Sequence, residues 1–311
     1  MDEEHSGLFQ NIGFYIIKGG MELLRLLPLK AAFGLATFLA NMFYFILLPL
    51  KKRMITQILH AGITKSNKEA SILARKNFIH MFKIGVEFMV FDKYITPQNL
   101  PDHIRVIYST PEAEQIFKDL AVPIIYASAH YGNWEMSGNV AAVMHPKIIS
   151  VMRAMPNKKL TDYLLSKRAI FKQELCFKKF SFNILLKSIR EGKSVGIICD
   201  QHAGRLGIET EFFGHPAKTF SSPALLHLRT GAPILVGVTK RRDDNFNYDV
   251  YLEGPIMLEK STGNIDEDAR ILTQMFTAAF ERLIRNDPVQ WTWTHRRWTD
   301  IYKKNKKRSS S

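Results

Sequence analysis

VPIIYASAHYGNWE, residues 122–135, is the stretch that predicts the class of fold. Its first eight residues have the continuous apolar character of a buried parallel strand, and Gly132-Asn133 is typical of a turn into a helix that begins near Trp134. We expect further strands at 104–108, 148–152, 194–199, 233–239 and 248–253, and helices near 67–94, 111–119, 134–144, 157–172, 183–191, 219–230 and 265–286. This alternation predicts an α/β fold with a largely parallel central sheet flanked by helices.

The same stretch places a histidine, His130, five residues before a carboxylate, Glu135. Inside one helix a separation of five residues turns two side chains about 140° apart, so the pair can meet only if His130 precedes the helix and Glu135 lies in its first turn. In that arrangement the carboxylate holds one ring nitrogen and leaves the other free to accept a proton from a hydroxyl. The alternative is a half-buried histidine beside a glutamate that suits the positive end of the helix dipole.

Composition limits the classes of function. The chain has 311 residues, of which 46% are hydrophobic, enough for one substantial α/β core. Its formal net charge of +14 favours partners that carry phosphate or are acidic: nucleic acid, anionic lipid or an acidic carrier protein. Cys176 and Cys199 are the only cysteines, too few for a disulfide framework and without the spacing of metal ligands. The histidines include no H-E-x-x-H pair, so we expect no metal.

The N-terminal region predicts membrane attachment. Ala31 to Leu50 contains twenty residues without a charge, and a helix of that length spans about 30 Å of hydrocarbon. A transmembrane helix, a helix lying in the interface and a buried core helix all remain open. Lys51-Lys52-Arg53 follows the run and places the rest of the chain on the cytoplasmic side. We therefore divide the chain into an anchor at 1–53, a catalytic domain at 54–302 and a basic tail at 303–311.

Four ordered blocks carry a family resemblance. His130-x4-Glu135 is similar to the H-x4-D/E signature of the glycerolipid acyltransferase superfamily, and HYGNWE resembles its lipid A late-acyltransferase branch. The other three blocks are VMRAMPN at 151–157 with Leu160 and Arg168, CDQHAGRLG at 199–207 running on to FFG at 212–214, and QWTWTHRRW at 290–298. The resemblance covers residues 124–298 and implies a glycerolipid acyltransferase-like fold with an N-terminal membrane anchor.

The resemblance implies roles for individual residues. His130 would take the proton of an acceptor hydroxyl as that hydroxyl attacks an acyl carrier protein thioester, and Glu135 would stabilise the imidazolium. No cofactor or metal is expected for this direct transfer. Arg153 and Arg168 would bind sugar phosphate or stabilise charge at the reacting carbonyl, with surface ion pairs as the alternative.

Four further residues of these blocks are expected to contribute to the site. Asp200 ends a predicted strand and would form the site with Gln201, unless it caps the Gly204–Gly207 loop as a structural carboxylate. Asn133 and Arg296 complete the expected substrate contacts, and Arg296 lies among tryptophans that suit a membrane interface.

We therefore expect a membrane-attached acyltransferase at a bacterial inner membrane, facing the cytoplasm. It would transfer a fatty acyl chain from acyl carrier protein to a hydroxyl of a lipid A precursor. Another glycolipid, such as a phosphatidylinositol mannoside, is the alternative acceptor, and acyl-CoA is the alternative donor. A non-catalytic basic protein that binds membrane or nucleic acid is the alternative of a different class. We do not expect nucleic acid as a partner, because no recognition-helix or zinc-module pattern accompanies the basic charge.

Overall fold

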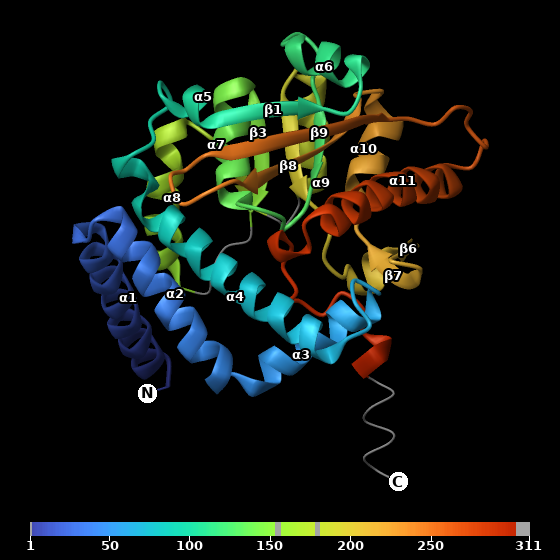
Figure 1. Cartoon of the computed structure of the whole chain (residues 1–311). Helices are drawn as coiled ribbons and strands as arrows, with labels where there is room; N and C mark the ends of the chain where they lie inside the picture. The colour runs from blue at the N-terminus through green and yellow to red at the C-terminus, as the bar shows by residue number, and fades with distance from the viewer. Residues whose placement is uncertain (1, 153–156, 178–180, 303–311) are drawn as a thin grey trace.

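A seven-stranded sheet forms the centre of the computed structural model, which describes residues 2–152, 157–177 and 181–302 (Figure 1). In order across the sheet, the strands are β1 (Ile104–Tyr108), β9 (Tyr248–Ile256), β8 (Ile234–Arg241), β2 (Ile125–Ser128), β5 (Ser194–Ile198), β3 (Ile148–Met152) and β4 (Glu174–Phe177). Neighbouring strands are parallel except β8 and β9, which are antiparallel. The predicted α/β fold with a largely parallel sheet is confirmed.

Helices cover both faces of the sheet, because alternate side chains of the buried strands point to opposite sides. Ile125 and Ala127 of β2 belong to the core on one face, and Tyr126 belongs to the core on the other. The helices of the first face are α9 (Ser181–Arg190), α10 (Ser222–Thr230) and α11 (Ile265–Asn286), and those of the second include α6 (Pro111–Lys118) and α7 (Trp134–Met144). Strand β2 therefore lies between two cores, which fix the position of its carboxyl end.

Two strand regions of the structure are not predicted from the sequence. β4 is a four-residue edge strand, and α8 (Lys158–Arg168) ends before it in a 3-10 turn at Ala169–Phe171, where we expect a helix over 157–172. β6 (Ile208–Phe212) and β7 (His215–Thr219) form a separate antiparallel hairpin. Side chains of α11 bind this hairpin, since Gln274 accepts a hydrogen bond from the Glu211 backbone at 2.7 Å and Glu281 accepts one from the Phe213 backbone at 2.7 Å. Such long-range contacts are invisible in a local pattern.

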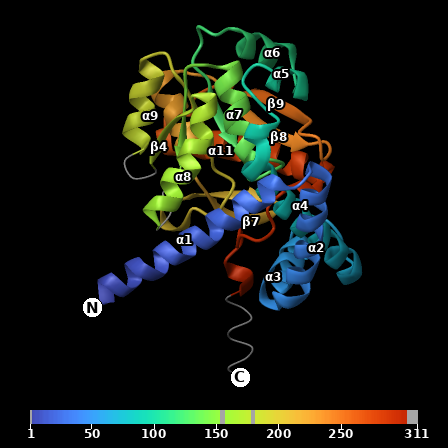
Figure 2. The same ribbon diagram turned by 90° about the vertical axis from the view of Figure 1, so that its left-hand side faces the viewer.

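The N-terminal region folds into four helices followed by a short fifth one. They are α1 (Asp2–Leu26), α2 (Leu29–Ile46), α3 (Leu48–His60), α4 (Asn67–Val90) and α5 (Leu100–His103). Figure 2 shows α1 as a long rod whose first turns project away from the sheet. The apolar run 31–50 is therefore not one continuous helix. It breaks at Leu47, because Pro49 lies in the first turn of α3, where its missing N–H costs no helical hydrogen bond.

Helix α2 has two different faces. Ala32, Ala36, Ala40 and Tyr44 are buried, and α2 packs extensively along α4. The opposite face leaves apolar side chains exposed to solvent: Leu35, Phe38, Met42, Phe45 and Ile46. Among the described helices, α2 alone is long and apolar enough to cross a membrane, judged by length and composition. The packing on α4 makes α2 part of the folded body.

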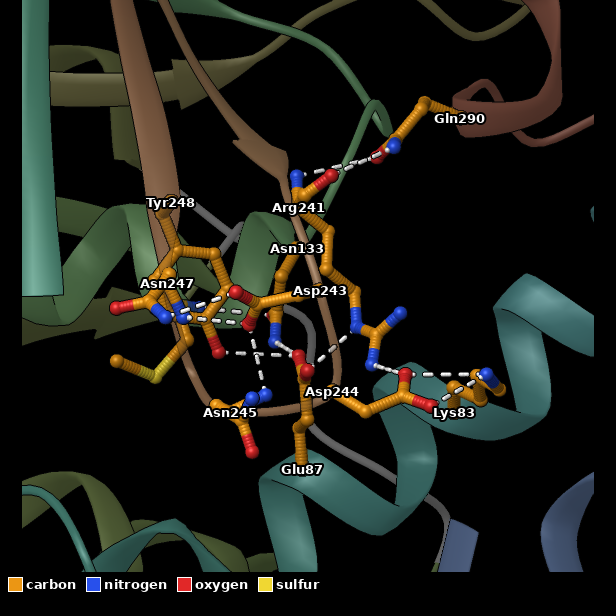
Figure 3. A network of polar contacts seen from close by, with 11 residues as sticks. Lys83, Glu87, Asn133, Arg241, Asp243, Asp244, Asn245, Asn247, Tyr248 and Gln290 are labelled. Atoms are coloured by element: carbon orange, nitrogen blue, oxygen red, sulfur yellow. Dashed lines mark hydrogen bonds and ion pairs between the residues drawn. The ribbon is translucent and has the colours of Figure 1, made fainter. Parts of the chain in front are cut away.

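A buried polar network joins α4 to the sheet and to the turn after β2 (Figure 3). Glu87 of α4 is fully buried and accepts hydrogen bonds from Asn133 Nδ2 at 2.6 Å and from the Tyr248 hydroxyl at 3.0 Å. It also forms an ion pair with Arg241, which in turn contacts Asp244. Because a buried carboxylate is costly without partners, this network fixes how α4 sits against β8 and β9.

Replacing Glu87 with alanine is expected to lower the free energy of unfolding by about 3–5 kcal/mol, because the buried Arg241 guanidinium loses its fully buried partner and keeps only the partly exposed Asp244. Urea unfolding followed by circular dichroism measures this loss. The control is Glu114→Ala, which removes an exposed ion pair with Lys118 and should leave the unfolding midpoint nearly unchanged. Equal midpoints for both variants would contradict the structural role of Glu87.

Candidate active site

The turn after β2 is clamped by backbone contacts from two other segments. Gly132 has a φ of +60°, a conformation that favours glycine, and its N–H donates to the Gln290 carbonyl at 2.9 Å. A Cβ at this position would lie 2.0 Å from the Thr239 carbonyl oxygen, so only glycine fits. The Asn133 N–H donates to the same Thr239 oxygen at 2.8 Å. The chain thus leaves β2 in one fixed direction, which determines where His130 projects.

His130 binds the carboxylate of Asp200. Its Nδ1 lies 2.8 Å from Asp200 Oδ1, and its backbone N–H donates to Oδ2 at 2.9 Å. Trp291 Nε1 donates to the same Oδ2 at 2.7 Å. A carboxylate can only accept, so the proton lies on Nδ1 and Nε2 is left with its lone pair toward the cavity described below.

The charges of this pair support each other. Burial by itself lowers the pKa of His130, but the charge and hydrogen bond of Asp200, with a smaller contribution from Glu135, raise that pKa above its ordinary value. Burial by itself raises the pKa of Asp200, but His130 and the hydrogen bonds from Trp291 and the His130 backbone lower it below its ordinary value. Asp200 is therefore ionised at neutral pH, and the imidazolium is easier to form than for an isolated buried histidine.

Glu135 does not hold the imidazole as the sequence predicts. Instead it forms an ion pair with Arg168, whose Nε lies 3.2 Å from Glu135 Oε2. The strand register explains why Asp200 rather than Glu135 contacts His130. Ser128 of β2 is level with Ile198 of β5, so the residues two positions further on, His130 and Asp200, emerge side by side at the carboxyl ends of adjacent strands. Glu135, in the first turn of α7, faces α8 instead.

Asn133 is also placed differently from the prediction that it contacts substrate. It is completely buried, its Oδ1 accepts the Met136 N–H at 3.0 Å as the N-cap of α7, and its Nδ2 binds Glu87. Both polar ends are used inside the protein, so Asn133 holds the turn in place. Gln201 does lie at the site, with its Nε2 3.4 Å from His130 Nε2.

Of the two remaining predicted arginines, only Arg296 can be placed, and it is not among the residues that line the cavity described below. Arg153 lies outside the described residues. Arg296 is exposed and stacks on Tyr302, 5.1 Å from the ring centre. Its neighbour Arg297 is buried, and its Nη1 donates to the carbonyls of Gln201 at 3.2 Å and Lys218 at 2.7 Å.

Arg297 was missed by sequence reasoning, although it stands in the same block as Arg296. Burial lowers its pKa to about 10, still well above neutral pH, so it remains charged and holds the segment after Asp200. Trp291 belongs to the tryptophans of this block, for which the sequence indicated only a membrane interface. The HRR and WTW patterns signal that this block matters, but they do not show which side chain faces inward.

His130 lines a largely apolar cavity of about 600 Å³. His130, Glu135, Arg168 and Gln201 lie among its lining residues. Its walls come from β2, β3, β5, β8 and β9 and from α7, and include Phe117, Val140, Met144, Ile148, Val250 and Leu252. This volume is within the range of sites that enclose an elongated apolar ligand. Within the described ranges, no three His, Cys, Asp or Glu side chains gather in a way that could hold a metal ion.

Comparison with known proteins identifies a family. Residues 3–300 match the family model of the bacterial lipid A biosynthesis acyltransferases. Phosphatidylinositol mannoside acyltransferases are also similar to this chain, at 22–24% identity. The one from Mycobacterium tuberculosis strain H37Rv is 24% identical over 178 residues, which are 56% of this chain and 54% of that protein. The one from Mycolicibacterium smegmatis is 22% identical over 178 residues, 56% of each chain.

The chain thus spans about half the length of the curated relatives it matches, whereas the family model spans almost all of it. The family match includes the turn with His130, the segment with Asp200 and the block with Trp291, which the fold brings together. The chain therefore belongs to the bacterial lipid A biosynthesis acyltransferase family.

Proposed function

We propose that this protein is an O-acyltransferase that moves a fatty acyl chain from a thioester to a hydroxyl of a membrane glycolipid. The observation that carries the proposal is that His130, held by Asp200, lines a largely apolar cavity. A histidine held by a buried carboxylate is suited to remove a proton from a hydroxyl, and the cavity is suited to an acyl chain. Family membership supports the same chemistry.

In the proposed reaction, His130 Nε2 takes the proton of the acceptor hydroxyl while the oxygen attacks the thioester carbonyl. Asp200 stabilises the imidazolium as it forms. The tetrahedral intermediate then collapses to the ester and expels the thiolate, which receives the proton from the imidazolium. Each step balances without a covalent enzyme intermediate, a metal or a cofactor. The Glu135–Arg168 ion pair at the cavity is proposed to hold the polar part of a substrate.

A lipid A precursor is the acceptor that we propose first, because the family model covers almost the whole chain. A phosphatidylinositol mannoside is the second candidate, favoured by the names of the relatives. Acyl carrier protein is the proposed donor, since the net charge of +14 suits an acidic partner. Mass spectrometry of lipids from a deletion strain tests the acceptor: one missing secondary acyl chain on lipid A supports the first candidate, and unchanged lipid A rejects it.

The proposed location is the cytoplasmic side of a bacterial inner membrane, with residues 1–53 as the attachment region of the catalytic domain 54–302. The exposed apolar face of α2 supports insertion into the lipid interface. A span is less favourable for α2, because its other face packs on α4, whose Arg75 donates to Asn41 of α2 at 2.6 Å. A span would carry this charged neighbour into hydrocarbon or pull the two helices apart.

The first test concerns the base. His130→Ala and Asp200→Asn should each lower kcat by about two or more orders of magnitude, because general-base catalysis contributes about 100-fold or more. Without the Asp200 charge the pKa of His130 falls, so its neutral form persists to lower pH. The acidic limb of the pH–rate profile of Asp200→Asn should therefore move to lower pH. A limb that stays in place, in a folded variant, would contradict the assignment of His130 as the titrating base.

The second test concerns Arg168. Arg168→Lys should reduce kcat/KM about tenfold, because an ammonium cannot reproduce the two-pronged contact of a guanidinium. Glu135→Gln, which removes the charge of its partner, should also reduce kcat/KM. Kinetics on acceptors with and without phosphate locate the effect: a loss seen only with the phosphorylated acceptor assigns Arg168 to phosphate. Arg190→Lys, on the exposed end of α9, is the control and should behave as wild type.

The third test concerns the membrane. In a flotation assay with liposomes of anionic phospholipid, Phe38→Glu combined with Phe45→Glu should shift the protein from the floating liposome fraction to the bottom fraction. Both side chains are exposed on the apolar face of α2. Leu120→Glu is the control. Leu120 is equally exposed but follows α6, at the opposite end of the molecule from α2 in Figure 1. If the double variant floats as fully as the control, α2 is not the attachment surface.

A further inference from the structure

Two hydroxyl groups in the cavity have no use in the reaction proposed above. Tyr126 and Ser128 both lie on β2, two residues apart, so their side chains point to the same face of the sheet, and both line the cavity. Tyr126 is 7% exposed and Ser128 is 8% exposed. Neither hydroxyl has a hydrogen-bond partner within the part of the chain that the structure describes. Buried hydroxyls are usually paired, so these two indicate a ligand that completes them.

The chemistry of the two groups restricts that ligand. Burial raises the pKa of Tyr126 well above its ordinary value, so both groups are neutral hydroxyls that donate and accept hydrogen bonds. Most of the other lining residues are apolar. A saturated hydrocarbon filling this space would leave both hydroxyls unpaired, which is unfavourable. The fitting ligand is therefore a mostly apolar chain that carries a neutral hydroxyl.

The position of Ser128 places that hydroxyl along the chain. Ser128 is the last residue of β2 and precedes His130 by two residues. A strand rises about 3.3 Å per residue, so Tyr126 lies about 7 Å further along β2 from Ser128, level with Gly196 of β5, which is in turn level with Ser150 of β3. Because the thioester carbonyl lies at His130 in the proposed reaction, the acyl chain meets Ser128 within its first few carbons.

Strand β3, on the other side of β5, carries a further polar group of the cavity, Ser150. Gln173 Nε2 donates to the Ser150 hydroxyl at 3.3 Å, and both residues line the cavity. A Cβ on Gly196 would lie 3.0 Å from Ser150 Oγ, so glycine leaves space in the cavity between Tyr126 and Ser150. The inner part of the cavity therefore contains several neutral polar groups among apolar walls, an arrangement that an unsubstituted chain does not require.

We propose that the cavity is built for a hydroxylated fatty acyl chain, with the hydroxyl near the thioester end bound by Ser128 and Tyr126. The inference rests on the proposed acyltransferase function, because it assigns the acyl chain to this cavity. A site that binds a substrate hydroxyl discriminates strongly against the analogue without it, since its own polar groups are then left unpaired.

The test compares donors that differ only in the hydroxyl. With one acceptor held fixed, 3-hydroxymyristoyl and myristoyl acyl carrier protein are compared by kcat/KM, and 2-hydroxymyristoyl acyl carrier protein locates the group along the chain. Wild type should prefer a hydroxylated donor by about tenfold or more, the worth of one hydrogen bond to a buried partner. Ser128→Ala and Tyr126→Phe should each reduce that ratio towards one. A wild-type ratio of one or below overturns the proposal.

Ser137→Ala is the matched control. Ser137 also lines the cavity, but its hydroxyl already donates to the Asn133 carbonyl at 3.4 Å, so its removal should leave the donor ratio as in wild type. A ratio that falls equally in all three variants would show a general disturbance of the cavity and would overturn the assignment to Ser128 and Tyr126.

A binding measurement separates this inference from the proposed function. Calorimetric titration of the full-length protein with 3-hydroxymyristate and with myristate requires no turnover. If no donor is turned over but the hydroxylated acid binds about tenfold tighter, the proposed reaction fails and the hydroxyl site stands. If the two acids bind equally tightly, the hydroxyl site is rejected, whatever the activity.

Discussion

A single buried carboxylate, that of Asp200, joins three segments that are far apart in the sequence. It accepts hydrogen bonds from the backbone and ring of His130 and from the indole of Trp291. An ionised group in the interior is tolerated only with such partners, so the end of β2, the end of β5 and the C-terminal block must come together for the fold to form. The same contacts orient the imidazole, so folding and the preparation of the base depend on one interaction.

A second layer of contacts keeps that arrangement rigid. Asn133 ties the turn after His130 to Glu87 of α4, and Gly132 brings the backbone against Thr239 of β8. Arg297 holds the carbonyl of Gln201 from the other side. Asn133, which looks like a substrate contact in its motif, thus serves as a support, and both polar ends of its side chain bind protein partners. Rigid support of this kind is what a positioned base requires.

The N-terminal helices connect to the cavity through α8. Arg25 of α1 and Lys167 of α8 both pair with Asp92, which follows α4, and the Tyr163 hydroxyl of α8 donates to Glu22 of α1 at 3.0 Å. Helix α8 also carries Arg168, which lines the cavity. Contacts from α1 and from Asp92 thus hold the helix that brings Arg168 to the cavity.

The sequence by itself determined the α/β alternation and the strand, turn and helix around His130, because these follow from local spacing. Its resemblance to the family marked the blocks around Asp200 and Trp291. Only the tertiary structure decided that Asp200 rather than Glu135 binds His130, and that Arg297 rather than Arg296 points inward. It also packed one face of α2 on α4. These outcomes depend on which strands and helices become neighbours, and in a parallel sheet that order is set by long-range packing that no local pattern contains.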